Sequence, residues 1–110
     1  MTGVVRIDPM AELARDPENP AESYVAPFVG DEPRFTAGIW GSEATETVFE
    51  GYPFDEAVVI LEGSIAITGE DGVTQTFLPG DSFGIKRGTP CTWVVAAGTR
   101  KVFAILEPSD

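Results

Sequence analysis

The side chains of this chain that could carry out chemistry do not include histidine, which is absent from all 110 positions. The candidates in its central region are a carboxylate, a phenol, a thiol and an ammonium group, at Glu56, Tyr52, Cys91 and Lys101. Neutral imidazole is the commonest ligand of catalytic transition metals and the usual base beside a catalytic serine or cysteine. The sequence therefore excludes a Ser/His/Asp triad and a Cys–His pair. It also contains no phosphate-binding loop and no dinucleotide-binding fingerprint.

Glu56 is the first candidate for a catalytic residue. Because side chains alternate along a strand, an inward Glu56 would share its face with Val58 and Ile60. A carboxylate that faces a cavity with apolar walls is partly desolvated, which suits a general base or acid. The alternative is a structural carboxylate that is hydrogen-bonded to Tyr52 or paired with Lys101. Under the catalytic interpretation, Glu56→Gln abolishes turnover and leaves folding intact.

Cys91 is the second catalytic candidate. As a thiolate it could act as a nucleophile, and positive charge on Lys86, Arg87 or Lys101 would favour that form. Two alternatives stay open for this residue: it forms part of the wall of a ligand cavity, or it is an unreactive cysteine of the core.

Four residues are candidates for ligand contacts: Glu50, Tyr52, Trp93 and Lys101. Tyr52 offers a hydroxyl donor, and the Trp93 indole can stack on a planar group; core packing is the alternative for both. Lys101 shares its face with Phe103. If Lys101 points inward, it can pair with the glutamate or hold an anionic substrate, whereas a bulge would turn it out to solvent.

The elements that position these residues have the period of β-strands. Asp71-Gly72 is a hairpin signal, and Pro79-Gly80 places proline and glycine where a tight turn needs them. Many short strands at regular spacing predict an all-β sandwich or barrel. We expect strands over residues 35–40, 45–49, 57–62, 64–68, 74–78, 81–85, 91–96 and 101–106.

The first third of the chain differs from the rest. Asp8-Pro9 is a helix-start signal, so one or two turns of helix are expected over residues 10–15. Closely spaced prolines at positions 17 and 20 then argue against regular structure. We interpret residues 1–33 as an arm that packs on the barrel or on a neighbouring subunit, and residues 34–110 as the barrel.

Two predicted strands, residues 57–61 and 102–106, are apolar on both faces. A barrel strand with one solvated face should alternate between apolar and polar residues. We therefore expect the outer face to be covered by the arm or by a second subunit, and we predict a homodimer.

Composition narrows the set of partners and the compartment. A net charge of −11 disfavours binding to nucleic acid and to anionic membranes, since both need Lys and Arg. One cysteine cannot form an intrachain disulfide. The N-terminus has no long apolar run after a basic start, so neither a signal peptide nor a transmembrane segment is predicted. A cytoplasmic location is the expectation.

Residues 50–63 and 80–91 resemble the two motifs of the cupin superfamily of RmlC-like barrels. In metal-binding cupins these motifs are G-x5-H-x-H-x3,4-E-x6-G and G-x5-P-x-G-x2-H. This chain has their glutamate and three of their four glycines but none of their histidines. The glutamate and glycine positions correspond to Glu56, Gly63, Gly80 and Gly88, the histidine positions to Glu50, Tyr52 and Cys91, and the proline position to Lys86. The resemblance implies a double-stranded β-helix, or jelly roll, with an N-terminal arm, and a barrel that has lost its usual metal.

A narrower resemblance covers roughly residues 35–106. Tyr52-x3-Glu56, residues 60–63, Pro79-Gly80-Asp81, Cys91-Thr92-Trp93 and Arg100-Lys101 are similar to the small single-domain cupins named after ureidoglycine aminohydrolase. The short members of that group mostly have no assigned function. The chain departs from their pattern at Lys86, where they have proline, and at Phe103, where they have tyrosine.

Two functions follow as hypotheses. The first is a cupin without metal or other cofactor that binds a small polar metabolite and performs acid–base chemistry of the hydrolase or lyase type. The second is a non-enzymatic dimeric domain that binds a ligand or acts as a scaffold, with a small, dry, apolar cavity. A metal held by Glu50, Tyr52, Glu56 and Cys91 ranks third, because tyrosinate and thiolate would have to replace imidazole.

Overall fold

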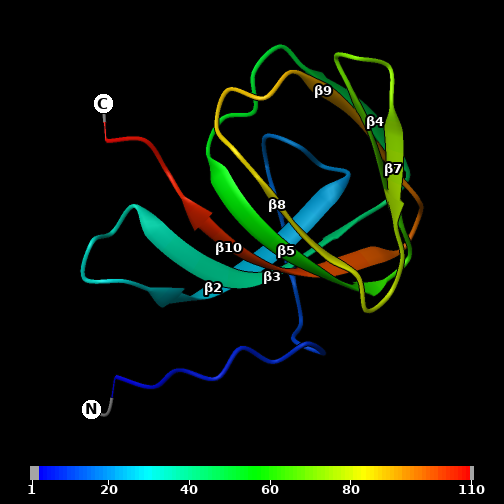
Figure 1. Ribbon diagram of the computed structural model, residues 1–110. Coiled ribbons are helices and arrows are strands. Elements are labelled where there is room, and N and C mark those ends of the chain that lie inside the picture. Colours follow the sequence, from blue (N-terminus) through cyan, green and yellow to red (C-terminus); the bar gives the residue numbers. More distant parts are fainter. Residues whose placement is uncertain (1–2, 110) are drawn as a thin grey trace.

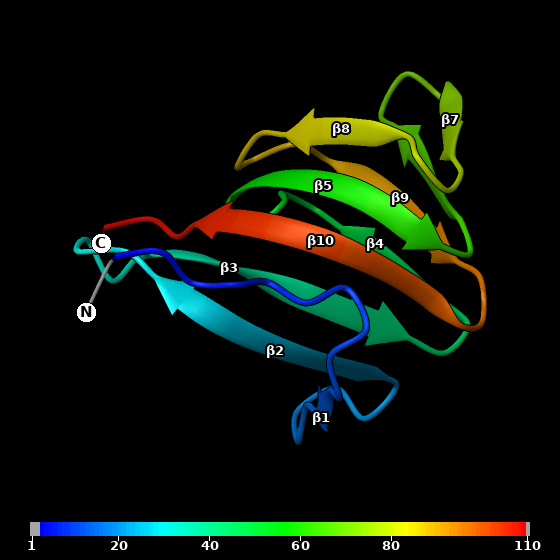
Figure 2. The same cartoon turned by 90° about the horizontal axis from the view of Figure 1, so that it is seen from below.

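The computed structural model describes residues 3–109 and is built from β-strands, with no helix in that range. Within these residues ten strands, β1 to β10, form two antiparallel sheets that face each other (Figures 1 and 2). The larger sheet has the order β1-β2-β3-β10-β5-β8, and the smaller one has the order β4-β9-β6-β7. This arrangement confirms the predicted all-β fold of the jelly-roll type.

The strands between residues 35 and 106 agree with those predicted, with ends that move by at most two residues. Gly72 and Gly80 in the predicted turns adopt positive φ angles of 83° and 92°, which glycine reaches without strain. The larger sheet contains β1 (Ala14–Arg15), β2 (Glu22–Val29), β3 (Phe35–Ser42), β5 (Asp55–Glu62), β8 (Ser82–Ile85) and β10 (Thr99–Leu106). The smaller sheet contains β4 (Thr45–Phe49), β6 (Ile65–Gly69), β7 (Thr74–Phe77) and β9 (Cys91–Val95).

The prediction of a helix over residues 10–15 is wrong. Asp8 makes the local contacts of a helix start, because its side chain accepts a hydrogen bond from the Met10 backbone N–H, but the chain does not continue as a helix. Instead, Arg100 Nη1 donates to the carbonyl oxygens of Pro9 and Ala11, each at 3.0 Å. A single turn of helix has a costly nucleus, and these carbonyls find partners on the sheet without it.

β2 lies within the segment that was expected to form an arm, and it extends the larger sheet by pairing with β3. The residues before it cross the outer face of this sheet, as Figure 2 shows for the dark blue segment. Ile39 on that face is fully buried, whereas Val59 and Leu106 on the same face stay 41% and 39% exposed. The N-terminal segment therefore covers β3 and leaves part of the apolar face of β5 and β10 open.

The main core lies between the two sheets. Strands alternate strictly here: along β5, Glu56, Val58 and Ile60 are buried and the residues between them are exposed or partly exposed. β9 contributes Cys91, Trp93 and Val95 from the opposite sheet. The predicted inward row of β5 is confirmed, and it brings a glutamate into a largely apolar layer.

We predict that Gly38→Ala lowers the free energy of unfolding by about 1–3 kcal/mol or more, which is the range for overpacking. A Cβ atom at Gly38 would lie 1.9 Å from the Val25 carbonyl oxygen and 2.8 Å from the Ala26 Cα, where β2 bulges over β3. Gly84→Ala is the matched control, because its Cβ would meet nothing closer than 3.8 Å. Urea denaturation of both variants measures the effect, and equal stabilities would contradict the proposed close approach.

Candidate functional site

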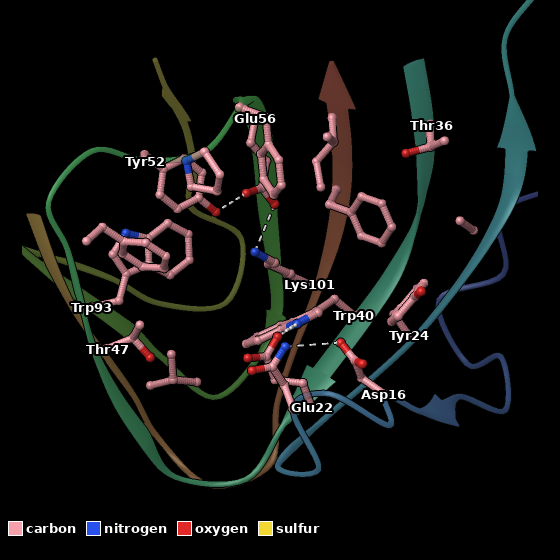
Figure 3. A pocket seen from close by; sticks show the side chains of 18 of the residues that line it. Asp16, Glu22, Tyr24, Thr36, Trp40, Thr47, Tyr52, Glu56, Trp93 and Lys101 are labelled. Carbon is pink, nitrogen blue, oxygen red and sulfur yellow. Dashed lines mark hydrogen bonds and ion pairs between the residues drawn. The ribbon is translucent and has the colours of Figure 1, made fainter. Parts of the chain in front are cut away.

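A cavity of about 610 Å³ lies between the sheets. One wall comes from β2, β3, β10 and β5, and the other from β4 and β9 (Figure 3). Tyr24, Thr47 and Glu107 line the cavity and are exposed, so it opens to solvent. The wall is largely aromatic, with Tyr24, Trp40, Phe49, Tyr52, Phe54, Trp93 and Phe103.

Three buried polar residues form one hydrogen-bonded group on this wall. Lys101 Nζ lies 2.9 Å from Glu56 Oε2, and the Tyr52 hydroxyl donates to Glu56 Oε1. Glu56, Tyr52 and Lys101 are 5%, 5% and 4% exposed. Lys101 therefore points inward, and the glutamate makes both of the contacts that were considered for it as a structural carboxylate.

Glu56 and Lys101 are not directly opposite each other in the sheet, and they meet through the length of their side chains. In the β5–β10 pair, Glu56 is opposite Ile105 and Lys101 is opposite Ile60, with a bulge between Arg100 and Lys101. Four residues of strand separate Glu56 from Ile60, which is about 13 Å. The long side chains of Glu56 and Lys101 lean toward each other along the cavity wall and close this gap, as Figure 3 shows.

Tyr52 is held in place by the turn that resembles the second motif. Its backbone N–H donates to the Thr89 carbonyl at 2.9 Å, and the Gly88 N–H donates to the Tyr52 carbonyl at 2.8 Å. Gly88 sits in that turn with a φ of 89°, which favours glycine. The backbone of Tyr52 thus joins the two motif-like segments, and its side chain donates to Glu56.

Two tryptophans enclose the Lys101 ammonium. Its Nζ lies 4.5 Å from the centre of the Trp40 ring and 4.8 Å from that of Trp93, both within the range of cation–π attraction. Tyr52 stacks on Trp93 with 5.1 Å between centroids and 6° between planes. Trp40 is fixed in turn by its Nε1, which donates to Glu22 Oε1 at 2.8 Å.

Electrostatics assign Tyr52 the role of a neutral hydrogen-bond donor. Burial raises the pKa of its hydroxyl far above the ordinary value, and the negative charge of Glu56 raises it further. Tyrosinate is therefore not accessible at neutral pH, and the proton of this hydroxyl stays on Tyr52 to serve Glu56.

Cys91 and Glu50 are not among the residues that line the cavity. Cys91 is buried beside it, and burial raises the pKa of its thiol, which disfavours the nucleophilic thiolate; a smaller contribution from the Trp93 indole lowers it. Glu50 lies in the exposed bend after β4. Of the six site residues predicted from sequence, the structure brings four together at the cavity: Tyr52, Glu56, Trp93 and Lys101.

Sequence reasoning missed Trp40 and Glu22. Both belong to the wall because β2 and β3 continue the sheet next to β10, where Trp40 is directly opposite Lys101. The strands of Trp40 and Lys101 were both predicted, but their pairing was not, because strand pairing is a nonlocal property. No pattern in the sequence marks Glu22 as a wall residue, because its strand lies in the segment that was predicted to be an arm.

The residues present do not fit the transition metal that the resemblance to metal-binding cupins implies. Both oxygens of Glu56 already have partners, the Tyr52 hydroxyl and the Lys101 ammonium. Within the described part of the chain, no group of three or more Cys, Asp or Glu side chains is placed to hold a metal ion. The set of Glu50, Tyr52, Glu56 and Cys91 considered from sequence is not assembled around one point.

Two facing antiparallel sheets around a cavity with a buried glutamate define this protein as a cupin, and comparison with known proteins agrees. The profile of the EutQ-like cupin domain matches residues 29–103, so the chain belongs to that family. No curated protein matches the chain. The narrower similarity to ureidoglycine aminohydrolase-type cupins stays a prediction.

Solved structures share the fold. A protein of unknown function of the DUF861 family from Pseudomonas syringae is 24% identical over 90% of this chain with a TM-score of 0.77, and the chain spans 46% of its length. The Clostridium difficile EutQ protein is 18% identical over the whole chain and 92% of its own, with a TM-score of 0.76. A DUF861 family protein from Thermotoga maritima is 32% identical over 62% of this chain and 76% of its own, with a TM-score of 0.55.

No segment among residues 3–109 forms a helix of the length and apolar character needed to cross a bilayer.

We predict that Glu56→Gln and Lys101→Met each lower the free energy of unfolding by about 3–5 kcal/mol, because each leaves one buried charge without its partner. The double variant should be within about 1 kcal/mol of the wild type, since it buries no charge. Urea denaturation of the four proteins forms a double-mutant cycle. Additive losses in the double variant would show that the two residues are not coupled. This prediction replaces the expectation that Glu56→Gln leaves folding intact.

Proposed function

We propose that this chain is a cupin that works without a transition metal, binds a small polar metabolite in the cavity and uses Glu56 for acid–base chemistry on it. The observation that carries the proposal is the hydrogen-bonded group of Tyr52, Glu56 and Lys101 on the wall of a cavity of about 610 Å³. Cavities of this size hold small-molecule ligands, and a few polar groups that converge on an aromatic wall are typical of a ligand site.

Charge and shape indicate the class of ligand. Besides Glu56, the cavity is lined by the carboxylates of Asp16, Glu22 and Glu107, against the single ammonium of Lys101 among the described lining residues. Glu56 already neutralises that ammonium, so the remaining field is negative and disfavours anions. Flat aromatic walls favour planar groups. A neutral or cationic molecule with a planar amide or ureido group fits both features.

The chemistry would be proton transfer at Glu56. Two donors, the Tyr52 hydroxyl and the Lys101 ammonium, orient its carboxylate. A ligand proton brought within reach of Glu56 could be taken up there, while Lys101 stabilises negative charge that develops on the ligand. Base-promoted elimination begins with such a step, and in hydrolysis Glu56 would take the proton from the attacking water instead. A fixed ammonium can stabilise the negative charge that develops in either reaction.

The second candidate function is a dimeric domain that binds a ligand without turnover. A barrel filled with side chains is disfavoured by the cavity volume of about 610 Å³ and by its polar residues. A binding domain without catalysis would use the same wall. The two candidates therefore differ only in whether a bound ligand is converted.

Intrinsic fluorescence tests for ligand binding, because both tryptophans of the chain, Trp40 and Trp93, line the cavity. We predict that small amides, ureido compounds or amines shift the emission and reduce acrylamide quenching, whereas carboxylates of equal size do not. Thr47→Phe should weaken binding at least tenfold by filling the cavity from β4. Thr92→Phe is the control, because Thr92 pairs with Val48 and so lies on the opposite face from Thr47. Equal binding by both variants would place the ligand elsewhere.

Conversion of the bound ligand separates the two candidate functions. The Glu56→Gln/Lys101→Met double variant is the informative protein, since it avoids an unpaired buried charge. Loss of turnover with a retained fold supports chemistry at the Glu56–Lys101 pair. Turnover that persists in this variant removes Glu56 from the mechanism, and binding with no turnover in the wild type favours the non-enzymatic domain.

We also propose that the chain forms a homodimer through the open part of the outer sheet face. Val59 of β5 and Leu106 of β10 leave apolar surface exposed there. We predict a dimer mass at micromolar concentration by light scattering, and a monomer for Val59→Glu. Val94→Glu is the control, because Val94 is similarly exposed, at 46%, on β9 of the other sheet. A monomeric wild type, or equal effects of both variants, would contradict this interface.

A further inference from the structure

The Lys101 ammonium occupies a site that is built for a cation. Among the described residues its hydrogen-bond acceptor is Glu56 Oε2, at 2.9 Å, and the ring faces of Trp40 and Trp93 lie at 4.5 Å and 4.8 Å. Lys101 and Glu56 are 4% and 5% exposed. A buried charge is tolerated only when it is paired, and here a carboxylate and two aromatic faces do this together.

Each wall of this cation site is itself fixed by another contact. Glu56 is oriented by the Tyr52 hydroxyl, Trp93 is stacked against Tyr52, and Trp40 is anchored by Glu22. The site therefore does not depend on Lys101 alone for its shape. A preorganised arrangement of this kind retains its preference for a cation when the tether is removed.

The chemistry of the walls selects an ammonium group and not a metal ion. A transition metal needs several lone-pair donors, and one carboxylate with both oxygens engaged supplies too few. Aromatic faces do not replace such ligands, but they attract organic cations through their quadrupoles. Glu56 occupies the glutamate position of the motif, yet its partner in this chain is the nitrogen of Lys101.

We propose that the Lys101 ammonium is the resident cation of this barrel: it holds the place of a metal ion, and its site binds an alkylammonium in preference to a divalent metal. The proposal concerns the cation alone and is independent of which ligand enters the cavity. It makes Lys101 a positioning residue for Glu56, whose carboxylate is held between the ammonium and the Tyr52 hydroxyl.

Untethering the cation tests the proposal. Lys101→Ala keeps the Cβ atom and removes three carbons and the nitrogen, which are the atoms of n-propylammonium. We expect Lys101→Ala to have a lowered melting temperature that rises by about 5 °C or more, with saturation, as n-propylammonium chloride is added. Wild type and Lys86→Ala, which truncates an exposed lysine, should not respond.

Three controls decide what the rise means. 1-Propanol has nearly the same size but no charge, and sodium chloride supplies the ionic strength; both should leave the melting temperature of Lys101→Ala nearly unchanged. In Glu56→Gln/Lys101→Ala the response to propylammonium should be lost, because the carboxylate partner is gone. Equal stabilisation by propanol would show that the variant has an apolar cavity without preference for a cation, and would overturn the proposal.

Metal content supplies the second readout. Untagged wild-type protein should contain less than about a tenth of an equivalent of any transition metal by elemental mass spectrometry. Nickel or zinc should stabilise Lys101→Ala less than propylammonium does. About one equivalent of metal in the wild type, or stronger stabilisation of the variant by metal, would overturn the proposal.

The proposal stays testable if Lys101→Ala does not fold by itself. The variant is then refolded from urea with propylammonium or with propanol, and the yield of protein that unfolds cooperatively is compared. Recovery with propylammonium alone supports the proposal, and no recovery with either compound overturns it.

Discussion

The buried ion pair between Glu56 and Lys101 is the constraint on which the rest of the site depends. Two charges removed from water are costly, and their attraction offsets that cost only when the geometry is good and the remaining polar atoms are satisfied. Here Glu56 gains a second donor from Tyr52, and Lys101 gains two aromatic faces. Tyr52 and the two tryptophan faces thus offset part of the cost of burying the pair.

The pair also explains why distant segments have to meet. Glu56 comes from β5, Lys101 from β10, Trp40 from β3 and Trp93 from β9, so both sheets contribute to one cluster. A slip of one residue in β5 or β10 would turn Glu56 or Lys101 outward and leave its partner unpaired, and a slip in β3 or β9 would remove an aromatic face from Lys101. A buried pair of this type stabilises little compared with apolar residues of similar volume. Its contribution is to make alternative registers unfavourable.

Sequence reasoning found the local part of this site and missed the nonlocal part. Alternation along one strand is a local property, so the inward row that contains Glu56 was predictable. Tyr52 lies before that strand, and its hydrogen bond to Glu56 was one of the alternatives considered for this glutamate. Lys101 points inward on the face that it shares with Phe103, because the register shift beside Arg100 does not interrupt the alternation along β10. What no pattern in the sequence signals is that its side chain reaches Glu56 on the neighbouring strand. The strand that carries Glu22 was not predicted, because Pro17 and Pro20 argued against regular structure in this segment. Both prolines lie before the first residue of β2.

The same distinction applies to Cys91. Its position in the motif suggested a place in the cavity, and alternation did put it on the inward row of β9. Distance along the strand then decided the outcome, because Trp93 fills the wall toward the cavity while Cys91 stays in the core beside Tyr52. Alternation specifies which face of the sheet a side chain occupies. Whether that side chain reaches the cavity depends on how the large side chains around it pack.

A tethered ammonium changes what the barrel can do compared with a bound metal ion. It carries one charge, donates hydrogen bonds and cannot change its oxidation state or expand its coordination. Chemistry that needs a Lewis acid or a redox centre is thereby poorly served, whereas stabilisation of a single developing negative charge is well served. The tether also means that the cation is always present at one equivalent. Under the proposal that Lys101 is the resident cation, the missing imidazole ligands and the inward Lys101 are connected, because the ammonium then supplies beside Glu56 the positive charge that a metal ion held by imidazoles would carry.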